Sequence, residues 1–132
     1  MKIGEVASRA GLPVKTVRYY ADIGLAPPSA RTQAGYRDYS EEDLRRLRFV
    51  RQSRAFGFSV EECRELLSLY SDHSRASADV KRIAEAKVAE LDRRMLELRA
   101  LRDELSGLAA RCQGDARPDC PILAGLAGEG AD

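Results

Sequence analysis

The chain has 132 residues, of which 44% are hydrophobic and 33% charged, enough for one small domain with a long helix beside it. No apolar run approaches membrane length and the first residues lack a signal-peptide core, so we expect a cytoplasmic protein without membrane contact. The net charge of +1 conceals two unlike parts. Residues 1–58 hold eleven Lys and Arg against six Asp and Glu, whereas residues 59–132 hold eleven against fifteen. A basic N-terminal part suits a polyanionic partner.

Two short helices joined by a tight turn are predicted at the N-terminus. Residues 3–10 and 14–22 each have an apolar face, and Gly11-Leu12-Pro13 between them favours a turn that leads into a helix. This pattern predicts a helix-turn-helix, although a plain αα-hairpin with solvated charges has the same pattern. We expect the second helix to expose charged, hydroxyl and aromatic side chains to DNA: Lys15, Thr16, Arg18, Tyr19 and Tyr20.

A two-stranded wing is predicted over residues 29–40. Pro27-Pro28 ends the second helix, and polar and aromatic residues alternate around Ala34-Gly35, a turn signal. Arginines can bind phosphates through paired hydrogen bonds, and tyrosines can pack or donate a hydroxyl group. The side chains of the wing that suit such contacts are Arg31, Tyr36, Arg37 and Tyr39. Tyr39 suits the hydrophobic core equally well.

Two further helices should follow the wing. Ser40, before three acidic residues, predicts an N-cap, and Ser59 begins a full capping box. The first of these helices carries Arg54, which we include as a further phosphate contact. Cys63 lies on the apolar face of the second, where it is most simply a small buried hydrophobic residue. Residues 71–77 form a polar linker.

One long helix is predicted over residues 78–109, where strong helix formers dominate. At 1.5 Å per residue it would be roughly 45 Å long. Its apolar residues recur at spacings of four and three, with one shift of the seam, as in a coiled coil. They are Ala84, Val88, Leu91, Met95, Leu98, Leu101, Leu105 and Leu108. A helix lying over its own domain is the alternative, but the length favours a dimerisation helix.

The segment CQGDARPDC is the candidate metal site. Its Gly, Pro and Asp residues allow the loop to fold back and bring Cys112 and Cys120 together. Two thiolates without a neighbouring His suit a soft ion that accepts few ligands, Cu(I) first, whereas structural zinc needs four. Cys120 precedes a short helix over 122–127, whose N–H groups would favour its thiolate. The alternatives are an unremarkable tail or a disulfide, which a reducing cytosol disfavours.

The motifs RYYADIGL and GYRDYS, together with the C-x7-C spacing, resemble those of MerR-family transcription regulators, and the resemblance covers nearly the whole chain. It implies a mainly α fold with a winged helix-turn-helix DNA-binding domain at 1–70 and a linker at 71–77. An antiparallel coiled-coil dimerisation helix at 78–109 and a metal-binding loop with a short C-terminal helix at 110–132 would follow. The resemblance also implies a homodimer that binds an inverted-repeat operator in double-stranded promoter DNA. On effector binding the dimer would distort this DNA so that RNA polymerase can engage it.

Ser77 narrows the choice of metal ion that the resemblance implies. Within the family, sensors of zinc, lead or mercury carry Cys at this position, whereas sensors of copper(I), silver and gold carry Ser. The resemblance thus implies a copper(I)-efflux regulator that activates copper-resistance genes, with Ag(I) or Au(I) as further ligands. It places Ser77 of the partner subunit beside Cys112 and Cys120, although Ser77 also suits a helix N-cap.

Two other functions compete with a copper sensor. A regulator of the same fold could respond to a divalent metal or to another thiol-reactive signal. A thiol enzyme or metal carrier without DNA function is the remaining class. The sequence has no C-x-x-C motif, no acid–base constellation and no phosphate-binding loop, so we predict that the protein is not an enzyme.

Overall fold

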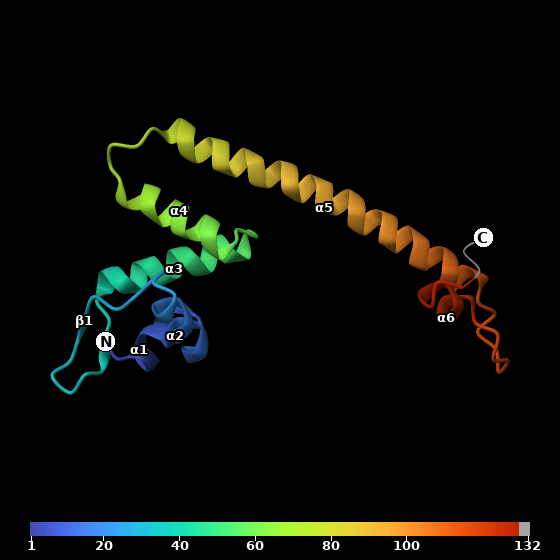
Figure 1. The fold of residues 1–132 in the computed structure, drawn as a ribbon, viewed down its shortest axis with the longest axis horizontal. Coiled ribbons are helices and arrows are strands. Elements are labelled where there is room, and N and C mark those ends of the chain that lie inside the picture. Colours follow the sequence, from blue (N-terminus) through green and yellow to red (C-terminus); the bar gives the residue numbers. More distant parts are fainter. Residues whose placement is uncertain (130–132) are drawn as a thin grey trace. The chain divides into compact units, whose positions relative to one another are not determined.

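The computed structural model describes residues 1–129, and these residues are mainly helical (Figure 1). In chain order the elements are α1 (Ile3–Ala10), α2 (Val14–Asp22), β1 (Ala30–Arg31), β2 (Arg37–Asp38), α3 (Glu41–Ala55), α4 (Val60–Ser71), α5 (Ser77–Arg111) and α6 (Pro121–Leu126). The chain divides into two compact units, one of residues 1–84 and one from residue 85 onward, and α5 runs from the first into the second. The predicted order of helix-turn-helix, wing and long helix is confirmed.

The helix-turn-helix is built from α1 and α2. Gly11 ends α1 with a φ of +71°, a left-handed conformation that residues with side chains rarely adopt. Its N–H group donates to the carbonyls of Ala7 and Ser8, which closes the last turn of α1. Pro13 then provides an extended residue directly before α2. This local chemistry turns the chain within three residues and lets both helices face one core.

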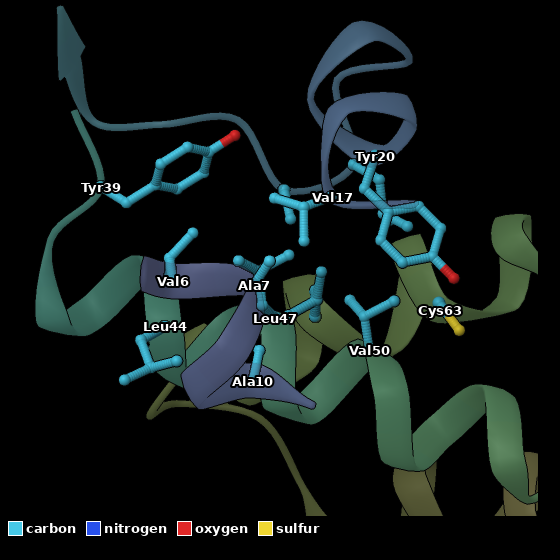
Figure 2. Packing of buried hydrophobic residues seen from close by; sticks show 13 residues of the cluster. Val6, Ala7, Ala10, Val17, Tyr20, Tyr39, Leu44, Leu47, Val50 and Cys63 are labelled. Atoms are coloured by element: carbon cyan, nitrogen blue, oxygen red, sulfur yellow. The ribbon is translucent and has the colours of Figure 1, made fainter. Parts of the chain in front are cut away.

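The hydrophobic core joins α1 and α2 to α3 and α4 (Figure 2). Its buried members are Val6, Ala7, Ala10, Val17, Tyr20, Leu25, Ala26, Tyr39, Leu44, Leu47, Val50, Cys63 and Leu67. Tyr39 is 2% exposed, so of its two possible locations it occupies the core. Tyr20 is only 6% exposed, which corrects the expectation that it is exposed on the second helix. Because Tyr20 follows Val17 by three residues, it shares the inward face of α2.

The wing is a small antiparallel hairpin. Ala30 pairs with Asp38 and Arg31 pairs with Arg37, so each strand has only two residues. Its turn is closed by the N–H group of Thr32, which donates to the carbonyl of Tyr36 at 2.7 Å. Hairpins this short have little stability of their own, so contacts with the helices must hold the wing in place.

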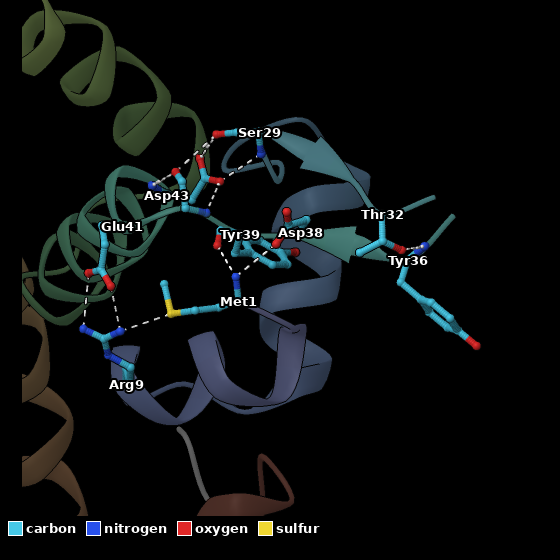
Figure 3. A network of polar contacts seen from close by, with 10 residues as sticks. Met1, Arg9, Ser29, Thr32, Tyr36, Asp38, Tyr39, Glu41 and Asp43 are labelled. Atoms are coloured by element: carbon cyan, nitrogen blue, oxygen red, sulfur yellow. Dashed lines mark hydrogen bonds and ion pairs between the residues drawn. The ribbon is translucent and has the colours of Figure 1, made fainter. Parts of the chain in front are cut away.

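A buried carboxylate attaches the wing to α3 (Figure 3). Asp43, in the first turn of α3, is 2% exposed and accepts hydrogen bonds from Ser29 N at 2.8 Å, Ser29 Oγ at 2.7 Å and Ser40 N at 2.8 Å. Burial alone would raise the pKa of Asp43, but the hydrogen bonds from Ser40 and Ser29 outweigh it and lower the pKa. Ser40 Oγ accepts from Asp43 N in return, which completes a capping box.

The second unit contains most of α5 and the short helix α6. With 35 residues α5 extends about 52 Å. It begins at Ser77, so Ser77 is the first helical residue and not a cap before the helix. Large apolar side chains remain exposed along α5 in the single chain, namely Val88, Leu91, Met95, Leu96, Leu98, Leu101 and Leu105. None of the helices in residues 1–129 combines the length and apolar character needed to cross a membrane.

Candidate DNA-binding surface and metal centre

A basic groove lies between the start of α1, α2 and the wing. It has a volume of about 500 Å³ and is lined by Lys2, Ile3, Arg18, Arg31, Gly35, Tyr36 and Arg37. Four of these residues carry positive charge, and they come from three separate elements. Such a concentration of cations attracts the phosphate backbone of nucleic acids.

Most side chains that the sequence assigns to DNA binding are accessible. Lys15, Arg18 and Tyr19 are exposed on α2, and Thr16 is half-buried. On the wing, Tyr36 is exposed near the turn, and Arg31 Nη1 donates to the carbonyl of Gly35 at 3.0 Å. The structure thus gathers Arg18 with the arginines of the wing, as the predicted winged helix-turn-helix requires.

Arg54 and Tyr20 lie outside this groove. Arg54 is in the last turn of α3, where its Nη1 donates to the carbonyl of Phe58 at 2.9 Å. Tyr20 packs in the core. Lys2, by contrast, lines the groove although sequence reasoning did not select it. The sequence feature that could have identified Lys2 is its position as a basic residue directly before the first helix.

Arg37 has a role that the sequence did not indicate. Its Nη2 donates to Asp22 Oδ1 at 2.6 Å, which links β2 to the last residue of α2. Its Nη1 is buried, and within residues 1–129 no atom accepts a hydrogen bond from it. Arg37 therefore fixes the wing against α2. This pairing joins residues fifteen positions apart, and no local pattern reveals it.

The candidate metal centre lies at the two ends of one loop. Cys112 directly follows α5, and Cys120 occupies the N-cap position of α6 without a formed side-chain cap hydrogen bond. Gly114 allows the loop to turn, with a φ of +67°, and Asp115 Oδ1 accepts from Arg117 N at 2.9 Å. The loop thus turns back from α5 toward α6, as its composition predicts.

The two thiols interact, and the environment favours a thiolate at Cys120. The N–H groups of Leu123 and Ile122 and the thiol of Cys112 lower the pKa of Cys120, with Leu123 contributing most and burial opposing. This is the effect that a helix N-terminus has on a thiol. Both cysteines are half-buried and neither forms a disulfide.

These two sulfurs fit a soft metal ion. Thiolates select ions such as Cu(I) over hard cations that prefer oxygen ligands. Among residues 1–129, no group of three or more His, Cys, Asp and Glu side chains is placed to hold a metal ion. Cys63 is separate from this centre, since it is fully buried in the core and burial raises the pKa of its thiol. The prediction that Cys63 is a small core residue is confirmed.

A winged helix-turn-helix with a basic groove, followed by a long helix, defines a DNA-binding protein of the winged-helix class. Comparison with protein families shows which one. Residues 1–69 match the family described as MerR HTH family regulatory protein, and residues 44–108 match the one described as MerR, DNA binding. The chain belongs to the MerR family of transcription regulators, whose members bind DNA and are not enzymes.

The similarity to individual relatives extends over nearly the whole chain. The HTH-type transcriptional regulator HmrR of Rhizobium leguminosarum bv. viciae is 57% identical, over 93% of this chain and 95% of its own. The HTH-type transcriptional regulator CueR of Salmonella typhimurium is 45% identical, over 97% of this chain and 93% of its own. The solved structure of the transcription regulator PbrR691 from Ralstonia metallidurans CH34, in complex with lead(II), matches with a TM-score of 0.79 and 37% identity. That match covers 96% of this chain and 98% of the other.

Proposed function

We propose that this chain is a metal-responsive transcription activator of copper-efflux or copper-resistance genes that responds to Cu(I), and also to Ag(I) or Au(I). It binds a palindromic operator in double-stranded promoter DNA as a homodimer. The observation that carries the proposal is the pair of thiols at the two ends of one turning loop, with Cys112 directly after α5 and Cys120 at the N-cap position of α6. The similarity to regulators named CueR supports the copper(I)-efflux type that the sequence motifs resemble.

The DNA-binding part of the proposal rests on the first unit. The groove between α2 and the wing takes the phosphate backbone, with Lys15, Thr16, Arg18 and Tyr19 on the helix. Arg31, Tyr36 and Arg37 contribute from the wing, and Arg54 gives a further phosphate contact outside the groove. Tyr20, which is 6% exposed, supports this surface from the core.

Dimerisation rests on α5. The apolar side chains exposed along residues 78–109 form the seam, and a second copy of the same helix, running antiparallel, covers them. Two copies present two basic grooves, which matches an operator with two half-sites. In this scheme residues 1–70 bind DNA, 71–77 connect, and 110–132 hold the metal loop.

The metal part of the proposal rests on charge. Cys112 and Cys120 would hold the ion, and Ser77 of the partner subunit would complete the surroundings. A monovalent cation on two thiolates leaves a site charge of −1, which lets the loop pack more closely than two unpaired thiolates do. The effector acts by its differential affinity for two dimer conformations, and the changed dimer bends the operator for RNA polymerase.

A regulator that responds to a divalent metal (zinc, lead or mercury) or to another thiol-reactive signal is the second candidate. The similarity to a lead(II)-bound regulator at 37% identity favours it. Ser77 argues against it, because a hydroxyl group is a poor ligand for soft divalent ions compared with a thiolate.

The test replaces one thiol. Cys112→Ser should bind the operator with near wild-type affinity and should fail to activate transcription in vitro when Cu(I) is supplied through a competing chelator. Cys63→Ala is the matched control, since Cys63 lies in the core, and it should keep the response. Activation of Cys112→Ser by Cu(I) would show that the site assignment is wrong. Activation of the wild type by zinc or lead(II) but not by Cu(I) would favour the second candidate.

A further inference from the structure

The metal loop is closed at its base by a contact between α5 and α6. Leu108 lies one helical turn before Cys112, and Gly125 lies in α6 beyond Cys120. The two residues therefore flank the loop on its two sides. Any contact between them fixes how far apart the ends of the loop can be.

This contact is unusually close. A Cβ atom placed on Gly125 would lie 2.6 and 2.7 Å from the two methyl groups of Leu108 and 3.2 Å from its Cγ. Ordinary van der Waals contact begins near 3.4 Å, so a side chain at position 125 would require either Leu108 to change its rotamer or α6 to move away from α5. Gly107, which is also helical, differs in this respect. A Cβ there would meet only the Arg111 guanidinium, at 3.7 Å.

We propose that Gly125 and Leu108 are positioning residues for the metal centre, because their close contact holds α6 at the depth that brings Cys120 to Cys112. The inference rests on the proposed function of these two cysteines. Neither Gly125 nor Leu108 offers a group that could bind a metal ion. Their effect is to restrict the conformational freedom that the ends of a nine-residue loop would otherwise have.

The reasoning depends on how precisely two ligands must be held. An ion with two ligands needs both sulfur atoms held at a defined distance from each other. Displacing a functional group by about 1 Å can weaken the function of a site up to a hundredfold. An alanine at position 125 clashes with the methyl groups of Leu108, and where Leu108 stays in place α6 must move several tenths of an ångström and carry Cys120 with it. The loss should therefore be nearer tenfold than a hundredfold.

The first measurement uses no metal. Reduced protein is equilibrated with mixtures of glutathione and glutathione disulfide, in which Cys112 and Cys120 lose two electrons and two protons to one glutathione disulfide and yield two glutathiones. The equilibrium gives the effective concentration of one thiol at the other, which reports their separation directly. Gly125→Ala should lower this effective concentration about tenfold, and Gly107→Ala should leave it unchanged.

A second substitution tests the cause. In the double variant Leu108→Ala/Gly125→Ala the clashing methyl groups are gone, so the effective concentration should return most of the way to the wild-type value. Operator affinity should be equal in the wild type, Gly125→Ala and Gly107→Ala, which shows that the DNA-binding unit is folded in both single variants. A wild-type effective concentration in Gly125→Ala would overturn the proposal, and so would a double variant no better than the single one.

The metal arm separates this proposal from the proposed function. Competition with a chelator should show Cu(I) bound about tenfold more weakly by Gly125→Ala than by the wild type. If the glutathione equilibrium shifts as expected but the wild type does not bind Cu(I), the positioning role stands and the proposed ligand is wrong. If the wild type binds Cu(I) and the glutathione equilibrium does not shift, the positioning role is wrong and the ligand stands.

Discussion

Replacing Asp43 should detach the wing from α3 and destabilise the first unit. The carboxylate accepts two backbone N–H groups and one hydroxyl group, at distances of 2.7 to 2.8 Å. Asp43→Ala removes the acceptor of all three hydrogen bonds at once, so three donors lose their partner. An unsatisfied buried donor costs about 1–3 kcal/mol, and Ser29 is exposed enough to recruit water. We therefore expect Asp43→Ala to lower the free energy of unfolding by about 2–4 kcal/mol.

Two further variants grade this effect. Asp43→Asn keeps an oxygen acceptor but loses the charge, so its loss should be about 1–2 kcal/mol. Glu42→Ala is the matched control, since the neighbouring Glu42 is exposed and pairs with Arg46 at 2.9 Å. An exposed pair of this kind contributes about 0.5 kcal/mol or less. Urea unfolding measures the free energy of unfolding of all three variants. One fixed protein concentration is used, because the stability of a dimer depends on concentration.

The dependence on pH supplies an independent check. Folding lowers the pKa of Asp43 below its usual value of 3.8, so the folded protein holds this proton less tightly than the unfolded chain. The stabilisation from Asp43 is therefore complete above pH 3.8 and is lost as the pH falls further through the lower, folded pKa. Wild-type stability should decline more steeply below that pH than the stability of Asp43→Asn. Equal slopes, or a cost of Asp43→Ala no greater than that of Glu42→Ala, would refute the reasoning.

Two further predictions concern the dimer and the DNA. Leu91→Glu would place a charge in the apolar seam of α5 at a cost of several kcal/mol, so analytical ultracentrifugation should show monomers; a full dimer would contradict the seam. Under the proposed DNA contacts, Arg37→Ala would remove one phosphate contact per protomer, so the slope of log K against log salt should flatten by about 2 units per dimer, and an unchanged slope would remove Arg37 from the DNA surface.

Local signals account for the parts of the fold that the sequence predicted well. Gly11 and the long run of helix formers place the bounds of α1, α2 and α5 within two residues of those observed, and the capping serines Ser40 and Ser59 place the starts of α3 and α4. Each of these features acts on its near neighbours, so its effect is visible in one sequence. The turning loop between Cys112 and Cys120 was predictable for the same reason.

The remaining features depend on contacts between distant residues. The ion pair of Arg37 with Asp22 and the wing anchor from Ser29 to Asp43 arise only once the helices have packed. Tyr20 was misplaced because an aromatic residue on a short helix suits either face, and the core around Val17 decides which. The close approach of Gly125 to Leu108 gives no signal beyond a glycine in a short helix.

The division of the chain has a consequence for how such regulators diversify. Every residue of the basic groove lies within the first 37 positions, whereas the two thiols lie after position 111. Under the proposed function, substitutions in the loop from Cys112 to Cys120 would alter what is sensed without altering any residue of the basic groove. Under that proposal, a gene could acquire a new chemical specificity through changes in this loop and at Ser77, while the residues of the basic groove stayed the same.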